Sequence, residues 1–255
     1  MNMLILTYIT PGYVHWFHHL YLNIQLLNLV PYFHVCASSP MKLGFKNVTV
    51  IESKFSKKAQ TFGSNEYGKI VNRKHDCILK FYKQTDILFL DTDVTVFRSP
   101  LQYLQRHNTG VPMFLEDSGP FRKKGTLNSG CMFLPRTDHS VKFMDTFVVH
   151  LKHTKSLYDQ DVLNMYKPQR YGLLDKNLFT NGFRFYENRH KHPVSRNLIL
   201  VHHNWISGDS NKWNRAKNFD CILNESTKKS FSNMLWRSSQ KSHWVFKKKG
   251  NQVLT

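Results

Sequence analysis

Short apolar runs alternate with longer amphipathic segments along most of this chain. Residues 4–10 form an apolar run that stops at Pro11 and Gly12, which predicts a buried strand followed by a turn. The next segment, residues 14–29, carries apolar side chains at helical spacing. The same alternation predicts further strands at residues 33–37, 48–51, 86–90, 111–115, 131–134 and 198–201, and helices at residues 66–82, 140–151 and 159–166. Strands that alternate with helices indicate an α/β fold with a layered, parallel sheet.

Two of the predicted strands end directly before side chains that can carry chemistry. Open α/β sheets bind their ligands at the carboxyl ends of the strands. Asp91 follows the strand at residues 86–90, and His202 follows the strand at residues 198–201. We therefore expect Asp91 and His202 at the ligand-binding edge of the sheet.

The composition is that of one basic domain. The chain has 255 residues, 41% of them hydrophobic, which is enough to bury the core of a single α/β domain. Its net charge of +19 attracts anions, so a nucleoside diphosphate, an acidic glycan, an acidic lipid or a nucleic acid would all be drawn to it. A solvated basic surface is the simpler alternative for most of these charges. The basic residues are spread along the chain, without zinc-finger spacing or an RNA-binding aromatic signature, so we expect no nucleic-acid partner.

The sequence leaves the cellular compartment open. It lacks the features of a signal peptide, and no apolar run reaches the length of a spanning helix, so membrane attachment would depend on an anchor absent from this chain. Two glycosylation sequons begin at Asn47 and Asn224, and they become acceptors only in the secretory pathway. The four cysteines form no close pair, which argues against a cysteine-based zinc site and leaves buried thiols and disulfides as alternatives.

The strongest chemical signal is a pair of carboxylates. Asp91 and Asp93 are two residues apart after an apolar strand, so in an extended segment both project to the same side. Two like charges this close repel each other and require a cation, a basic partner or water between them. A hard divalent cation meets this requirement, because it binds few protein carboxylates and completes its shell with substrate phosphates. The pattern predicts a metal site, and the alternative is a strand-end turn with two solvated aspartates.

Two further segments place polar residues at the start of a predicted strand or helix. Asn128 and Gly130 precede the strand at residues 131–134, where the amide can bond a sugar hydroxyl and glycine permits the close approach of a ligand. An ordinary turn is the alternative for this segment. Asp159 and Gln160 begin a predicted helix, so Asp159 either satisfies free amides there or faces a sugar together with Gln160.

A fourth segment runs from His202 to Lys212. An imidazole is a competent ligand for a borderline ion such as Mn²⁺, although a lone histidine is usually structural. Lys212 can neutralise a diphosphate as a point charge, and Gly208 lies where the loop between them must turn tightly. The short spacing after an apolar strand favours a ligand at His202.

Taken in order, these four segments resemble the nucleotide-diphospho-sugar transferase domain of the GT-A glycosyltransferases. The similarity is greatest to glycosyltransferase family 77, and glycogenin-like enzymes share a similar order of motifs. The resemblance implies a single Rossmann-like GT-A domain at residues 1–219, with a mostly parallel central sheet flanked by helices. Residues 220–255 would then be a basic C-terminal extension whose role the resemblance does not indicate.

The resemblance also implies a role for each matching residue. Asp93 would bind the metal most directly, Asp91 would hold the ribose and the metal together, and His202 would be the third protein ligand. Lys212 would contact the diphosphate, with Gly208 in the same loop.

The remaining matches surround the sugar and the base. Asn128 and Gly130 would lie beside the donor sugar, and Asp159 and Gln160 would lie near the reacting carbon. Two assignments rest on position alone. Arg73 lies on the helix that usually precedes the Asp-x-Asp strand. Tyr8 lies by the end of the first strand, where the chain usually lines the nucleotide site, so uracil would stack on its ring.

The implied activity is a metal-dependent hexosyl- or pentosyltransferase that retains the anomeric configuration. We expect Mn²⁺ or Mg²⁺ as the cation, a nucleotide-sugar donor linked to UDP, and a glycan or glycoprotein acceptor. The implied location is the Golgi or another lumen of the secretory pathway. Two alternatives remain: a metal-dependent phosphoryl-transfer enzyme or nuclease, which would require a further carboxylate for a second metal, and a non-catalytic glycan-binding module on the same fold.

Overall fold

The computed structural model describes residues 3–50, 65–119, 124–154, 158–187, 195, 197–206, 208–219 and 221. The extension expected at residues 220–255 therefore lies outside the described residues, except for Cys221. Within the described ranges, no helix combines the length and the apolar character that a bilayer span demands. Every cysteine of the chain is a buried free thiol, one of the two alternatives that the sequence left open.

The main layer is a seven-stranded sheet in the order β3-β2-β1-β4-β7-β6-β8. Its first four strands are parallel, and β7 runs antiparallel to both β4 and β6. The predicted mostly parallel central sheet is therefore confirmed. The strands are β1 (Met3–Ile9), β2 (Phe33–Ala37), β3 (Val48–Val50), β4 (Asp86–Leu90), β6 (Met113–Glu116), β7 (Leu127–Leu134) and β8 (Gly172–Leu173).

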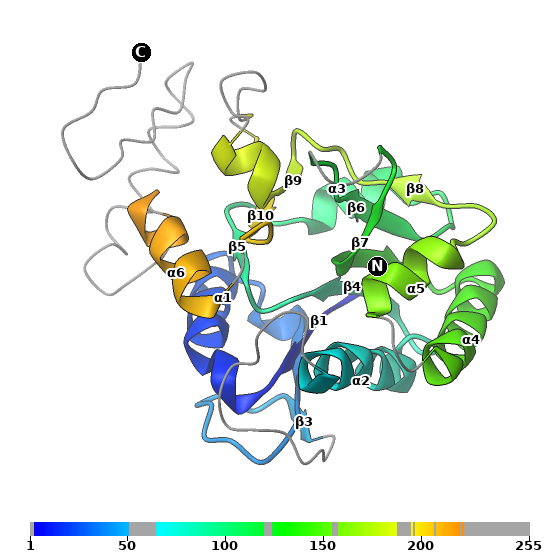
Figure 1. The fold of residues 1–255 in the computed structure, drawn as a ribbon, viewed down its shortest axis with the longest axis horizontal. Helices are drawn as coiled ribbons and strands as arrows, with labels where there is room; N and C mark the ends of the chain where they lie inside the picture. The colour runs from blue at the N-terminus through cyan, green and yellow to red at the C-terminus, as the bar shows by residue number, and fades with distance from the viewer. Residues whose placement is uncertain are drawn as a thin grey trace.

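Helices cover both faces of this sheet (Figure 1). Successive strand residues point to opposite faces, and Ile5 and Leu6 of β1 are both fully buried, one on each side. The helix α1 packs on the face of Ile5, whereas α2, α4 and α5 pack on the face of Leu6. The helices are α1 (Val14–Leu26), α2 (Asn65–Phe81), α3 (Leu101–His107), α4 (Asp138–His153), α5 (Asp159–Met165) and α6 (Asp209–Asn218), with shorter turns at Pro11–Tyr13, Val30–Tyr32 and Phe183–Glu187.

A second, three-stranded sheet was not predicted. It has the order β5-β10-β9, formed by β5 (Val94–Val96), β10 (Leu200–His202) and β9 (Phe179–Asn181). The strand expected at residues 198–201 belongs to this small sheet and runs antiparallel to β5. Since β5 begins only a few residues after β4 ends, the chain crosses from one sheet to the other through the Asp-x-Asp segment.

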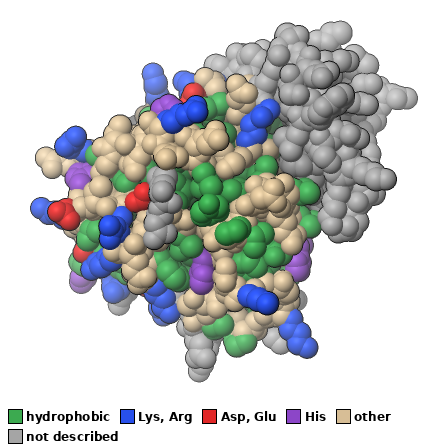
Figure 2. All heavy atoms as spheres, turned by 180° about the vertical axis from the view of Figure 1, so that it is seen from behind, with side chains coloured by type: hydrophobic (Ala, Val, Ile, Leu, Met, Phe, Trp, Pro, Cys, Tyr) green, Lys and Arg blue, Asp and Glu red, His purple; other side chains and the backbone are tan. Residues whose placement is uncertain are grey.

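Basic side chains are scattered over the face shown in Figure 2, and they do not gather into one patch there. This distribution fits a solvated basic surface on that face. On this face the basic side chains do not mark a functional site, so we looked for the site in the arrangement of individual residues.

Candidate active site

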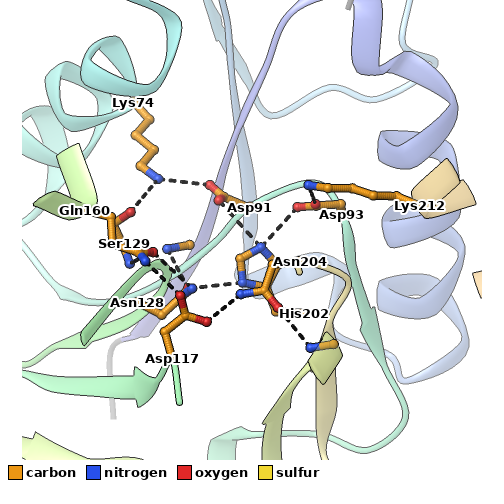
Figure 3. Close-up of polar contacts among 12 residues, drawn as sticks. Lys74, Asp91, Asp93, Asp117, Asn128, Ser129, Gln160, His202, Asn204 and Lys212 are labelled. Carbon is orange, nitrogen blue, oxygen red and sulfur yellow. Dashed lines mark hydrogen bonds and ion pairs between the residues drawn. The ribbon is translucent and has the colours of Figure 1, made fainter. Parts of the chain in front are cut away.

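The Asp-x-Asp segment lies at the junction of the two sheets (Figure 3). The N–H of Asp91 donates a 2.8 Å hydrogen bond to the carbonyl of Gly130 on β7, which holds Asp91 to the main sheet. Asp93 directly precedes β5, and its carbonyl accepts a 2.8 Å hydrogen bond from the N–H of His203 at the end of β10. One carboxylate is therefore positioned by each sheet.

Antiparallel pairing brings His202 to the same place. β10 pairs with β5 so that His202 lies opposite Val94, the residue after Asp93. The Nε2 atom of His202 lies 3.2 Å from Oδ1 of Asp93 and 3.8 Å from Oδ2 of Asp91. The three predicted ligands thus lie together, with one ligand atom from each within 4.8 Å of the other two.

The hydrogen bonds of Asn128 determine which nitrogen of the His202 ring carries a proton. Oδ1 of Asn128 accepts from the N–H of Gly130 at 2.8 Å, and Nδ1 of His202 donates to the same oxygen at 3.1 Å. An imidazolium at His202 would also donate from Nε2 to Asp93, as an ion pair. In a neutral ring, the lone pair of Nε2 would instead face both carboxylates, and that arrangement requires a positive charge between the three groups. Two carboxylates and one imidazole could together hold a divalent metal ion.

Gly130 leaves room for this group of ligands. A Cβ atom at this position would overlap the carboxylate of Asp91 and would lie 2.5 Å from Cε1 of His202. Any larger residue would therefore displace both side chains. The sequence predicted the close approach of a bound ligand at this glycine, and the structure places the side chains of Asp91 and His202 there.

Lys212 places a cation against Asp93. Gly208 precedes α6 with a φ of +85°, which glycine adopts without strain, and α6 then carries Lys212 toward the junction. The Nζ atom of Lys212 lies 2.6 Å from Oδ2 of Asp93, and Asp93 is a buried residue with only 8% of its surface exposed. Burial would raise the pKa of Asp93, but Lys212 and His202 outweigh this effect and hold the pKa well below its usual range.

A second cation, Lys74, enters the site from α2. Its side chain is 4% exposed, and its Nζ atom lies 2.8 Å from Oδ2 of Asp159, 3.2 Å from Oδ1 of Asp91 and 3.3 Å from Oγ of Ser129. Burial would lower the pKa of Lys74, but Asp159 and Asp91 outweigh it and raise the pKa. Burial would raise the pKa of Asp159, but Lys74 and His75 hold it below its usual value. Both groups are therefore charged at neutral pH.

The structure brings Lys74, and not Arg73, into the site. Arg73 lies on the exposed face of α2 and pairs with Asp76 at 2.7 Å. Lys74 shares the buried face of α2 with Cys77 and Ile78, three and four residues later. That spacing is the signal that could have identified Lys74, because a lysine on the apolar face of a helix requires a buried partner.

Asp117, which the sequence analysis did not single out, holds Gln160. Nε2 of Gln160 donates to Oδ2 of Asp117 at 2.8 Å, and Oε1 of Gln160 accepts from Nδ2 of Asn128 at 3.2 Å. Nδ2 of Asn204 and Nε1 of Trp205 donate to Oδ1 of Asp117 at 2.7 and 2.8 Å. Asp117 directly follows β6, which is parallel to β4, so its position at a strand end is a signal that could have identified it.

Two further residues lie outside this group. Tyr8 is 8% exposed and packs in the core with Cys36 and Cys77, so the stacking of uracil on its ring stays a prediction. His203 points away from His202, as alternation along a strand requires, and its Nε2 atom lies 2.7 Å from Oγ1 of Thr95.

Solved structures share this fold at low sequence identity. The galactosyltransferase LgtC, in complex with donor and acceptor sugar analogs, matches with a TM-score of 0.53 and 13% identity, over 88% of this chain and 99% of that one. A glycosyltransferase involved in the glycosylation of the major capsid of PBCV-1 matches with a TM-score of 0.53 and 14% identity, over 84% and 98% of the two chains. The glycosyltransferase GlyE of Streptococcus pneumoniae TIGR4 matches with a TM-score of 0.53 and 13% identity, over 98% and 66%. These likenesses confirm the predicted GT-A fold.

A family profile identifies the chain more directly. The profile is described as nucleotide-diphospho-sugar transferase, and it matches residues 36–216, well over half of the chain. A search of curated proteins finds no match. The predicted domain boundary at residue 219 and the choice between family 77 and the glycogenin-like enzymes stay predictions. The profile and the fold agree, and the chain belongs to the nucleotide-diphospho-sugar transferase family, whose members are glycosyltransferases.

Proposed function

We propose that this chain is a metal-dependent, retaining enzyme that moves a sugar from a UDP-linked donor to a glycan or glycoprotein acceptor. The observation that carries the proposal is the group formed by Asp91, Asp93 and His202, whose ligand atoms lie within 4.8 Å of one another. Lys74 and Lys212 contact the two carboxylates at 3.2 and 2.6 Å. Carboxylates and an imidazole suit a divalent cation, and ammonium groups beside them suit a diphosphate.

Asp91, Asp93 and His202 would hold the cation, for which we propose Mn²⁺ before Mg²⁺. An imidazole ligand favours Mn²⁺, because Mg²⁺ prefers oxygen ligands and retains its waters. When bound, the cation would offset the negative charge that develops on the leaving diphosphate.

Lys212 would contact that diphosphate. Its ammonium group has three donors, so it can contact the carboxylate of Asp93 and a phosphate oxygen together. Lys74 would supply positive charge from the opposite side of Asp91. Its burial keeps the ammonium group in one place, which favours a preorganised site over one that must reorganise during the reaction.

Asp159 and Gln160 would lie near the reacting carbon. The charge of Asp159 is fixed by Lys74 and His75, at 2.8 and 3.0 Å, and can stabilise positive charge that develops on the sugar ring. The amide of Gln160 is oriented by Asp117 and Asn128. We propose retention of the anomeric configuration from the family resemblance. A proton NMR spectrum of the first product should show the donor's anomer, and the opposite anomer would exclude retention.

The metal is tested by titration of UDP into the protein. In calorimetry, UDP should bind at least about tenfold more tightly with Mn²⁺ than with EDTA, because a bridging cation adds contacts to phosphate oxygens. Uridine, which has no phosphate, is the matched ligand and should bind equally in both conditions. Equal affinity of UDP with Mn²⁺ and with EDTA would contradict a metal-assisted donor site.

We also propose that the enzyme acts in the Golgi or another lumen of the secretory pathway. Asn47, the first residue of one sequon, is exposed beside β3. In a secretory host, wild type should therefore show a mobility shift on treatment with an N-glycosidase, and Asn47→Gln should lose part of it. A chain that carries no glycan in such a host would argue against this location.

A further inference from the structure

Trp205 is held in a conformation that bulky residues rarely adopt. Its φ is +66°, in the left-handed region, which is strained for a tryptophan. The indole is nevertheless fixed, because its Nε1 atom donates to Oδ1 of Asp117 at 2.8 Å. Such strain persists only where the surroundings impose the conformation, and it is frequent at ligand sites.

The indole ring of Trp205 packs against Gly119 and Phe183. A Cβ atom at Gly119 would lie 2.5 and 2.8 Å from Cζ2 and Cζ3 of Trp205, so only glycine allows the ring this position. The ring of Phe183 lies beside the indole, with centroids 5.6 Å apart and planes at 48°. Trp205 and Phe183 are both partly buried residues, and the hydrogen bond to Asp117 places the indole beside a polar group.

The aromatic pair lies next to Gln160. Asp117 joins them, since one of its carboxylate oxygens accepts from Trp205 and the other accepts from Gln160. Figure 3 shows Asp117 and Lys212 at opposite ends of the candidate site. A diphosphate contacted by Lys212 would therefore leave the region beyond Gln160 to another ligand.

We propose that Trp205 and Phe183 form the platform on which the terminal sugar of the acceptor stacks. This inference rests on the proposed function, because the acceptor must approach the reacting carbon from the side that the diphosphate does not occupy. A sugar ring has an apolar C–H face and polar edges, and an aromatic ring beside amide and carboxylate groups matches both. At the donor end, Lys212, Asp93 and Asp91 offer charged groups, which suit a diphosphate.

The binding test uses simple glycosides and does not depend on turnover. Methyl glycosides of galactose, glucose, xylose and arabinose are titrated into the protein while the indole N–H signals are followed by NMR. Trp205→Phe removes one signal and so identifies it. At least one glycoside should shift that signal in a saturable manner. If none of the four shifts it, the platform is excluded.

The kinetic test separates acceptor binding from donor chemistry. The glycoside that binds best serves as the acceptor, and hydrolysis of the donor without an acceptor is measured beside transfer. Phe183→Leu, which leaves the hydrogen bond from Trp205 to Asp117 in place, should raise the acceptor KM about tenfold and leave donor hydrolysis unchanged, because stacking contributes about one such factor. Trp205→Ala should raise the acceptor KM at least as much. Tyr32→Ala, which removes an exposed aromatic ring elsewhere, should match wild type.

Two other results would separate a failure of the inference from a failure of the proposed function. An equal fall of donor hydrolysis and transfer in Trp205→Ala and Phe183→Leu, with unchanged thermal melts, would assign the rings to the donor site and overturn the inference. If wild type turns over no nucleotide sugar, the proposed function fails, and the NMR titration still decides whether the platform binds a sugar.

Discussion

The carboxylate of Asp93 is enclosed by groups that stabilise its negative charge. Lys212 contacts one oxygen at 2.6 Å, and His202 contacts the other at 3.2 Å. Its neighbour Asp91 is more exposed and is shared with Lys74. Removing the charge of Asp93 would leave a lysine and a histidine without their common partner, so a substitution at this residue should disturb the candidate site directly.

We expect Asp93→Asn to lower metal-dependent turnover at least ~100-fold, because the amide keeps the size of the side chain but removes a charged ligand. The measurement is Mn²⁺-dependent release of UDP beside a thermal melt, which should stay a single cooperative transition. Asp138→Asn, at an exposed position of α4, is the matched control and should resemble wild type. Wild-type dependence on Mn²⁺ in the Asp93 variant would rule out the assignment.

Lys212→Ala should weaken the binding of UDP more than that of uridine. A charge-assisted contact to phosphate contributes roughly 1.5–3 kcal/mol, or about ten- to a hundred-fold in affinity. Both affinities are measured by calorimetry with Mn²⁺ present. Lys217→Ala removes an exposed charge from the same helix and controls for the overall field. Equal weakening of both ligands would mean that Lys212 shapes the loop and does not contact phosphate.

Some residues of the site could be predicted from the sequence, and others could not. Asp91, Asp93 and His202 follow strong apolar runs, so the local pattern already indicates the strand ends where ligands bind. Lys74 and Asp117 carry weaker local signals, a lysine on the apolar face of a helix and an aspartate at a strand end. Their partners, Asp159 and Gln160, are distant in sequence, so the local pattern could mark each residue but could not show what it pairs with.

Among the elements, β4 was predicted with its observed bounds, whereas β5 was not predicted at all. β4 is a run of buried apolar residues within the main sheet, so its pattern is visible locally. β5 has only three residues and gains its order from β10, more than a hundred residues later. This late pairing is nevertheless what carries His202 to Asp93.

The pair of Lys74 and Asp159 joins α2 to α5, and we expect Lys74→Met to lower the free energy of unfolding by about 3–5 kcal/mol. The loss should fall toward the lower end of that range, because His75 still donates to Asp159. Urea unfolding measures it. Lys69→Met, at an exposed position of α2, should change stability little. A loss in Lys74→Met no larger than in the control would show that the pair does not stabilise the fold.

His19 connects α1 to the small sheet. Its Nε2 atom lies 2.8 Å from Oγ1 of Thr95, and the same oxygen lies 2.7 Å from Nε2 of His203. Burial lowers the pKa of His19 to about 3 and holds that of His203 well below its usual value. Both imidazoles are therefore neutral in the folded protein at neutral pH.

This arrangement predicts that acid destabilises the fold. Below about pH 6.5 the unfolded chain binds protons at both histidines and the folded chain does not, so stability is complete above that pH. As the pH falls from there toward 3, the free energy of unfolding decreases by about 1.4 kcal/mol for each pH unit and for each of the two histidines.

Urea unfolding at about pH 7.5 and about pH 5 tests this slope. His19→Gln should lose less stability between the two conditions than wild type. The exposed His18→Gln variant on the same helix should keep the wild-type slope. A slope in His19→Gln as steep as that of wild type would contradict the role of the buried imidazole.

For the molecule as a whole, the α/β class and the mostly parallel sheet were predictable because each strand and helix has a local pattern. The small sheet was not, since each of its strands has three residues and their pairing is nonlocal. The net charge of +19 favours the capture of an anionic donor by the molecule as a whole, without indicating where it binds.

The most direct test of the central claim is a screen of nucleotide-sugar donors. The full chain is incubated with Mn²⁺ and a panel of UDP-, GDP- and CMP-linked sugars, and the release of free nucleotide is measured, with EDTA and with Asp93→Asn as controls. We predict that at least one UDP-linked sugar releases UDP, that this release requires Mn²⁺, and that it is lost in Asp93→Asn. Release that persists unchanged in EDTA, or no release from any donor, would contradict it.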